Sequence, residues 1–237
     1  MCKVLHMKNT IIIISLFIFC DIKIIFGLPN FGELPGQITY PDDACSIELS
    51  KDELFHRKNL NIAYFGKRLP DYKCYYNIVK KNIVYMVNLE YVVIDDYFST
   101  DYPDIFKYFY NIKELSIRFD FIRLLPIELS HFSKLEKLRI VMKLDNLPQW
   151  FTNLNHLQYL NLYGSSFNHL DGNILLNTNI NHLVIDIKYY NSLPINFCNN
   201  LSRKIEFRVP PLFNKKEKKK LKKYFPNCKI SFSESIF

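Results

Sequence analysis

Glycine is scarce in this sequence, with six residues in 237, and the glycine-based motifs of nucleotide-binding and hydrolytic enzymes are missing. There is no P-loop, no dinucleotide-binding glycine pattern and no GxSxG turn around a nucleophilic serine. The zinc-protease motif HExxH is also absent, as are CxxC pairs and clusters of Cys and His at zinc-ligand spacing. We therefore predict that the protein is not an enzyme and uses no metal and no cofactor.

The amino-terminal apolar run, residues 11–20, is too short to cross a bilayer. It follows Lys3 and Lys8, and this order of a basic and then an apolar region is typical of a secretory signal peptide. We predict that residues 1–27 are a signal peptide, cleaved after Gly27, and that the protein is secreted or held at the cell envelope or surface. An uncleaved signal anchor is one alternative. Lipidation at Cys20 is another, which the bulky Phe19 disfavours.

A strong internal repeat occupies the middle of the chain. Six stretches share a register of 22 or 23 residues and begin at residues 79, 102, 125, 147, 170 and 193. At positions 1, 5, 8, 11, 14 and 16 of these stretches, 31 of 36 residues are apolar, whereas a composition of 49% hydrophobic residues predicts about half. A fixed period of this length is typical of a solenoid, whose coils stack because none can bury its apolar residues alone.

Each coil is predicted to contain one short parallel strand and a return segment with helical turns. The apolar residues at positions 14 and 16, such as Leu138 and Ile140, alternate as in a strand with one buried face. Earlier apolar positions are three or four residues apart, and a proline, which is tolerated where a helical turn begins, precedes them in four coils. The register predicts a single column of Leu115, Leu138, Leu160 and Leu183.

The best copies read LPIELSHFSKLEKLRI at 125–140 and LPQWFTNLNHLQYLNL at 147–162. They resemble the bacterial form of the leucine-rich repeat family, LPxxIxxLxxLxxLxLxxNxL. The resemblance covers residues 79–209 and implies an α/β leucine-rich repeat solenoid, a short curved horseshoe with a parallel β-sheet on its concave face. About six repeats and two caps are expected. The family's asparagine at position 19 is missing, so we expect looser turns on that edge, although Ser165 at this position can still bond the turn backbone.

The two ends of the repeat depart from the pattern. Residues 28–78 do not fit the template and are predicted to be a leader and an N-terminal cap, because a solenoid must cover its exposed end. Residues 210–237 are predicted to be a basic C-terminal capping helix, which starts at Asn214, followed by an edge strand. In the last coil, core positions hold charged residues while Ile205, Phe207 and Val209 alternate one residue away, which predicts a one-residue slip of the strand.

Four cysteines follow the predicted signal peptide, two on each side of the repeats: Cys45, Cys74, Cys198 and Cys228. An even number in an exported protein permits disulfides, and one pair at each end would hold both caps. Three connectivities are open, and so is the alternative that the cysteines are small buried apolar residues.

The net charge of +8 is concentrated at the ends of the sequence. Residues 28–208 hold 20 basic and 20 acidic residues, whereas residues 209–237 hold eight lysines and two glutamates. A lysine run of this kind can contact an anionic surface, but it contains no arginine and no interleaved aromatics for base stacking, which makes nucleic acid an unlikely partner. The alternative interpretation is that these lysines form the solvated outer face of a cap.

The outward strand positions are the candidate binding site, because every coil contributes one strand to a common ribbon. Tyr and Arg are favoured at binding hot spots, and the candidate residues are Tyr91, Asp95, Arg118, Lys137, Arg139, Tyr159, Tyr163, His182 and Asp186. Arg118, Arg139, Tyr159 and Tyr163 would form the anchor, with acidic rims at Asp95 and Asp186. The alternative is a merely solvated face, and a general acid/base pair of His182 and Asp186 is a third interpretation.

By analogy with the leucine-rich repeat family, the expected function is non-enzymatic binding of a protein or peptide partner through the concave face, in adhesion, host interaction or scaffolding. The alternative function is that of a surface-associated structural protein, which contacts anionic polymer or membrane through the lysine-rich C-terminal helix.

Overall fold

The computed structural model describes residues 51–56, 58–64, 80–96, 102, 104–176, 178–198 and 203–234. The predicted signal peptide, the predicted leader and both Cys45 and Cys74 lie outside these ranges. The boundaries proposed for those segments stay predictions.

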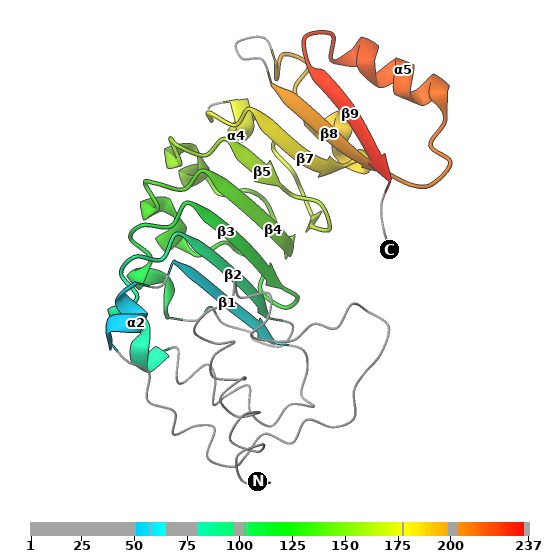
Figure 1. Cartoon of the computed structure of the whole chain (residues 1–237). Helices are drawn as coiled ribbons and strands as arrows, with labels where there is room; N and C mark the ends of the chain where they lie inside the picture. The colour runs from blue at the N-terminus through cyan, green and yellow to red at the C-terminus, as the bar shows by residue number, and fades with distance from the viewer. Residues whose placement is uncertain are drawn as a thin grey trace, which may run out of the picture.

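One sheet of parallel strands runs through the described residues (Figure 1). The strands follow the order β1-β2-β3-β4-β5-β7-β8-β9, and β6 lies off this path beside β4. Their bounds are Asn59–Tyr64 for β1, Tyr91–Asp96 for β2, Glu114–Phe119 for β3, Lys137–Leu144 for β4, Tyr159–Asn161 for β5, Ser166–Phe167 for β6, His182–Asp186 for β7, Lys204–Val209 for β8 and Lys229–Glu234 for β9. The sheet lines the inner side of an arc, and the predicted leucine-rich repeat solenoid is confirmed.

Short helical segments return the chain along the outer side of the arc (Figure 1). They are α2 (Lys51–Phe55), η3 (Ile83–Tyr85), η4 (Phe106–Tyr108), η5 (Ile127–His131), η6 (Gln149–Asn153), α4 (Asn173–Leu176) and η7 (Ile187–Ser192). Pro126 and Pro148 stand in extended conformation immediately before η5 and η6, where a missing N–H costs no helical hydrogen bond. Each of these two turns buries its central apolar residue, Leu129 or Phe151, under the sheet.

The core is a set of apolar columns that cross the strands. Strand register places Leu115 beside Leu138, Leu138 beside Leu160 and Leu160 beside Leu183, so the predicted column is confirmed. Every member is at most 2% exposed. Full burial of one such side chain contributes about 1.5–3 kcal/mol, which is why a strict period of this length specifies the fold.

The sheet continues beyond the strands of the six repeats at both ends, with the predicted edge strand at the carboxyl end and an unpredicted strand at the amino end. In β8, Ile205 and Phe207 are buried while Glu206 lies between them on the other face, as the predicted slip requires. At the amino end, β1 lies inside the segment predicted to be a cap, and its Leu60 continues the buried column beside Val92. β9 pairs with β8 and ends the described sheet.

The helix α5 (Lys215–Tyr224) is the return segment between β8 and β9 and lies at the far end of the arc (Figure 1). The Asn214 side chain accepts a hydrogen bond from the Glu217 backbone N–H at 2.9 Å, which caps the helix as predicted. Leu221 and Phe225 are buried, and the Phe225 ring packs on that of Phe207 with a centroid distance of 6.1 Å. The basic helix is thus fixed to the core by a narrow apolar face.

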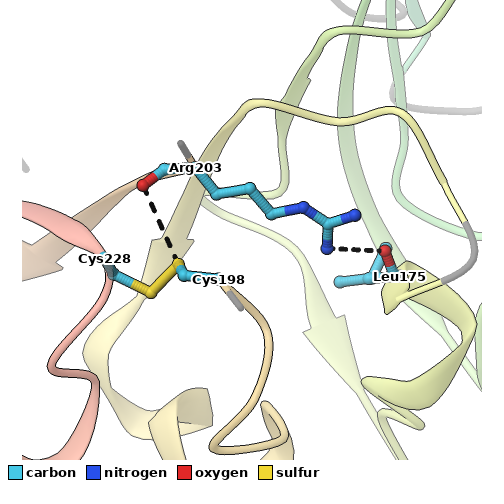
Figure 2. Close-up of a disulfide and its surroundings, with 4 residues drawn as sticks. All are labelled: Leu175, Cys198, Arg203 and Cys228. Atoms are coloured by element: carbon cyan, nitrogen blue, oxygen red, sulfur yellow. Dashed lines mark hydrogen bonds between the residues drawn. A yellow bond between two sulfur atoms is a disulfide. The ribbon is translucent and has the colours of Figure 1, made fainter. Parts of the chain in front are cut away.

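A disulfide joins the coils of β8 and β9, and a buried arginine joins the coil of β8 to that of α4 and β7 (Figure 2). Cys198 is bonded to Cys228 across a sequence separation of 30, and a loop of this length corresponds to about 3.6 kcal/mol of stabilisation in the chain-entropy model. Arg203, only 3% exposed, has its guanidinium 4.5 Å from the centre of the Phe197 ring. Its side chain donates hydrogen bonds to the backbone oxygens of Leu175 (3.1 Å), Leu176 (3.3 Å) and Thr178 (2.7 Å).

Side-chain hydrogen bonds bridge the coils on both edges of the sheet. At position 19 of the fourth coil, the buried Ser165 hydroxyl donates to the Ile140 carbonyl at 2.7 Å and so replaces the family's asparagine. On the opposite edge, asparagines at position 10 donate to carbonyls of the preceding coil, Asn111 to Val87 at 2.8 Å and Asn179 to Asn155 at 2.6 Å. The turn edge is less loose than expected here, since β4 continues to Leu144 and pairs with β6.

Candidate functional site

The concave face consists of three rows of outward residues set by the strand register. The first row is Tyr91, Glu114, Lys137, Tyr159, His182 and Lys204. The second is Val93, Ser116, Arg139, Asn161, Val184 and Glu206. The third holds Asp95, Arg118 and Val141 on one side of β5 and Asp186 and Arg208 on the other. Eight of the nine predicted site residues therefore belong to these rows, and Tyr163 lies two residues after the end of β5.

The carboxyl-terminal half of this face, over β5, β7 and β8, is internally paired. Glu206 lies 3.5 Å from His182 Nε2 and 3.3 Å from Arg208 Nη2, and its carboxylate accepts a hydrogen bond from the Ser233 hydroxyl at 2.6 Å. Arg208 in turn lies over the Tyr163 ring, 5.3 Å from its centre. These contacts cover the second row so well that Val184, an outward residue, is 1% exposed.

Electrostatics at Glu206 follow from this pairing. Burial raises the pKa of the Glu206 carboxyl, but the Ser233 hydroxyl and the charges of Arg208 and Lys204 outweigh burial, and the net pKa is below its usual range. For His182, burial and the charge of Lys204 outweigh the attraction of Glu206, and the pKa of the imidazole is lowered. The neutral imidazole is therefore the favoured form in this cluster.

The amino-terminal half, over β2, β3 and β4, contains ion pairs of its own. Lys137 Nζ donates to Glu114 Oε1 at 2.6 Å, and this hydrogen bond raises the pKa of Lys137. Arg118 Nε lies 3.8 Å from Asp95 Oδ1, so the predicted rim carboxylate and the predicted anchor are neighbours. Burial raises the pKa of Asp95, and the charge of Arg118 opposes that rise.

Besides Lys137, three side chains of the rows in this half stay open to solvent. Tyr91 is 41% exposed and Val93 is 38% exposed, and Arg139 is exposed in the middle row. Within the described ranges, no ion pair of Arg139 is found, and its row neighbours on β3 and β5 are the uncharged Ser116 and Asn161. Burial raises the pKa of Asp95, and the charge of Arg139 helps to offset that rise. An aromatic ring and an aliphatic side chain on β2 and an exposed guanidinium on β4 are thus presented on the same face of the sheet.

The acid/base pair considered from the sequence is not brought together. His182 and Asp186 lie four residues apart along β7, which separates them by roughly 13 Å at about 3.3 Å per residue. His182 contacts Glu206, whereas the Asp186 carboxylate accepts a hydrogen bond from the Gly164 N–H at 3.3 Å. Direct proton transfer between the two needs a hydrogen-bond distance, so this pair cannot share a proton.

Glu206 and Arg208 were not among the predicted site residues, because the repeat template assigned them to core positions. The alternation of Ile205, Phe207 and Val209 predicts that Glu206 and Arg208, which lie between them, point outward. In the part of the chain that the structure describes, no group of three or more His, Cys, Asp and Glu residues is arranged to hold a metal ion. None of the described helices has the length and apolar character that a membrane span requires.

No family model and no curated protein matches the sequence. Among solved structures, the chain is similar to a leucine-rich repeat protein of Leptospira interrogans, with 23% sequence identity and a TM-score of 0.43. The match covers 76% of this chain and 38% of that protein, so this chain spans well under half of its length. The strand register and buried columns of this chain establish its leucine-rich repeat fold.

Proposed function

We propose that this chain is an exported, non-enzymatic recognition protein that binds a protein or peptide through the amino-terminal half of its concave face. The observation that carries the proposal is the contrast between the two halves. Over β5 to β8, charged and aromatic side chains contact one another, whereas Tyr91, Val93 and Arg139 remain exposed.

The chemistry of these three residues suits a binding surface. Tyr and Arg are enriched among the residues that dominate interface energies, and an exposed arginine that forms no ion pair within the described residues can bond a carboxylate of a ligand at two points. Neighbouring strands lie about 4.8 Å apart, so β2 to β4 and their flanks offer a strip wide enough for an extended peptide or one protein loop. We expect an acidic side chain of the partner at Arg139.

The test compares two double variants with matched substitutions. Arg139→Glu with Tyr91→Ala changes the proposed surface, and Arg123→Glu with Tyr110→Ala changes an exposed arginine and an exposed tyrosine outside the sheet. Affinity capture from the surroundings of the producing cell identifies the partner, and calorimetry with the purified partner then gives its affinity. We expect the first variant to lose about 2 kcal/mol or more of binding free energy, the range of a hot spot, and the second to bind as the wild type.

Equal binding by the wild type and the Arg139→Glu, Tyr91→Ala variant would refute the assignment to this half of the face. Loss of binding only on Glu206→Ala and Tyr163→Ala would instead move the site to the carboxyl-terminal half. Circular dichroism spectra of all variants serve as the folding control. Tyr91, Arg139, Tyr110 and Arg123 are exposed, so their replacement should leave the sheet intact, whereas Tyr163 and Glu206 are only partly exposed and the spectra must show that those two variants are folded.

A further inference from the structure

The loop that leads into α5 contains a backbone conformation that its sequence does not favour. The Phe213 N–H donates to the Pro210 carbonyl at 3.2 Å, which closes a turn with Pro211 and Leu212 at its centre. Leu212 has a φ of 73°. Proline followed by a residue with positive φ is the pattern of a type II turn, in which the second central position strongly favours glycine.

No packing compensates for leucine at this position. Leu212 is 98% exposed, the highest exposure among the large hydrophobic residues of the described chain. Its neighbour Phe213 turns the other way and packs on the Phe232 ring with a centroid distance of 6.0 Å. The turn therefore holds an aliphatic side chain out in solvent, and a residue that breaks a local rule without a structural gain is a candidate for a functional role.

The helix that follows presents a uniformly basic surface beside this leucine. Six of its lysines are exposed: Lys215, Lys216, Lys219, Lys220, Lys222 and Lys223. Lys218 differs, because it turns inward with its Nζ 5.6 Å from the centre of the Phe232 ring. Glu217 is the one acidic residue of α5, and it shares the face of Leu221, four residues later, instead of the opposite, outer face. Within the described residues, no ion pair neutralises the six exposed lysines.

We propose that Leu212 and the outer face of α5 together bind an anionic lipid bilayer. The lysines supply the attraction to acidic headgroups, which amounts to about a fivefold gain in partitioning for each residue near the surface. The Leu212 side chain enters the boundary between headgroups and acyl chains, where removal of its apolar surface from water contributes to the binding free energy. A polyanion such as nucleic acid would bind the lysines but offers no apolar phase for Leu212. In addition, α5 lacks both arginine and exposed aromatic rings for base stacking.

This surface is separate from the recognition face proposed above. It belongs to the last return segment at the far end of the arc, whereas Tyr91 and Arg139 lie on β2 and β4 (Figure 1). The Arg139→Glu, Tyr91→Ala variant should therefore bind vesicles as the wild type does. Failure of either proposal leaves the other untouched.

The experiment measures binding of the full chain, as processed on expression, to vesicles of phosphatidylcholine with 30% phosphatidylserine, and to vesicles of phosphatidylcholine alone. Leu212→Gly is the informative variant, because glycine suits the positive φ and the fold should be at least as stable as the wild type. We expect about tenfold weaker partitioning into anionic vesicles with an equal or higher Tm. Leu124→Ala, at a residue that is 65% exposed elsewhere on the molecule, is the control and should bind normally.

The charge component is tested with Lys216, Lys219 and Lys223 replaced together by Gln. Binding to anionic vesicles should fall on the order of a hundredfold, and 1 M salt should abolish most wild-type binding. The proposal is overturned if anionic vesicles are not bound, or if Leu212→Gly binds them as tightly as the wild type. Equal competition by duplex DNA against the wild type and Leu212→Gly would assign the surface to polyanions in general, which also overturns it.

Discussion

Replacement of Arg203 should destabilise the carboxyl-terminal end of the solenoid more than any exposed substitution. Its guanidinium bonds three backbone oxygens in a buried position without a carboxylate partner. Of the three acceptors, the Leu175 oxygen keeps a second donor, the Thr178 hydroxyl at 2.7 Å. The Leu176 and Thr178 oxygens are the ones that lose their bonded donor when the side chain is truncated.

The expected magnitude follows from two opposing contributions. A buried carbonyl that loses its donor, as at Thr178, costs about 1–3 kcal/mol, and the partly buried Leu176 carbonyl costs less. Removal of a buried charge returns part of its desolvation cost. We expect Arg203→Ala to lower the free energy of unfolding by about 3 kcal/mol. Arg203→Met, which keeps an unbranched apolar stem over Phe197, should lower it by about 2 kcal/mol. Arg139→Ala, at an exposed arginine without an ion pair, should stay within about 0.5 kcal/mol of the wild type.

Urea unfolding followed by two signals tests this prediction. Far-ultraviolet circular dichroism reports the whole sheet, and fluorescence of Trp150, the single tryptophan, reports η6 in the middle of the solenoid. Because coils contact only their neighbours, the Arg203→Ala variant should lose part of its dichroism before the Trp150 signal changes. Coincident transitions at the wild-type midpoint would refute the argument, since they would show that the freed carbonyls find other donors.

Two further perturbations have directions that the structure sets. A Cβ at Gly172 would lie 2.1 Å from the Ser192 carbonyl oxygen, so Gly172→Ala should lower the free energy of unfolding in urea by about 3 kcal/mol. Gly164 has a φ of 85° and lies beside a side chain that can move, so Gly164→Ala should lower it by about 1–2 kcal/mol. Equal costs for the two variants would contradict the close approach at Gly172. The pKa of His182 is lowered in the fold by burial and by Lys204, so its contribution is present above pH about 6.5 and is lost as the pH falls toward the folded-state pKa. Unfolding free energies at pH 7 and pH 5 should therefore differ less in His182→Gln than in the wild type, and an unchanged difference would count against a buried neutral imidazole.

The buried columns were predictable because the repeat period fixes the register between neighbouring strands. Strand partners from β2 to β8 are 22 or 23 residues apart, as with Tyr91 and Glu114 or Lys137 and Tyr159. From β2 to β7, the residues at repeat positions 14 and 16 are all apolar, and a shift of one residue would turn the whole set to solvent. The strand β1 was not predicted, because its Asn59 pairs with Tyr91, 32 residues later, across a coil longer than the repeat period.

The pairing on the concave face was only partly accessible from the sequence. Glu114 and Lys137 occupy the same position in adjacent coils, so their ion pair could have been derived from the template. The three acceptors of Arg203 could not, because they are backbone oxygens at the end of α4, and their positions depend on how that short helix terminates. Sequence patterns encode which side chains share a row, but not which carbonyls remain free.

The distribution of charge connects the two proposed surfaces. Residues 28–208 carry equal numbers of basic and acidic residues, so long-range attraction to an anionic membrane acts mainly on the lysine-rich end. Because α5 is a return segment on the outer side of the arc, contact through it and Leu212 leaves the strands of the inner side uncovered (Figure 1). Salt should therefore separate the two activities: vesicle binding through α5 should fall steeply with ionic strength, whereas contacts of Tyr91 and Val93 with a partner, which are apolar in character, should persist.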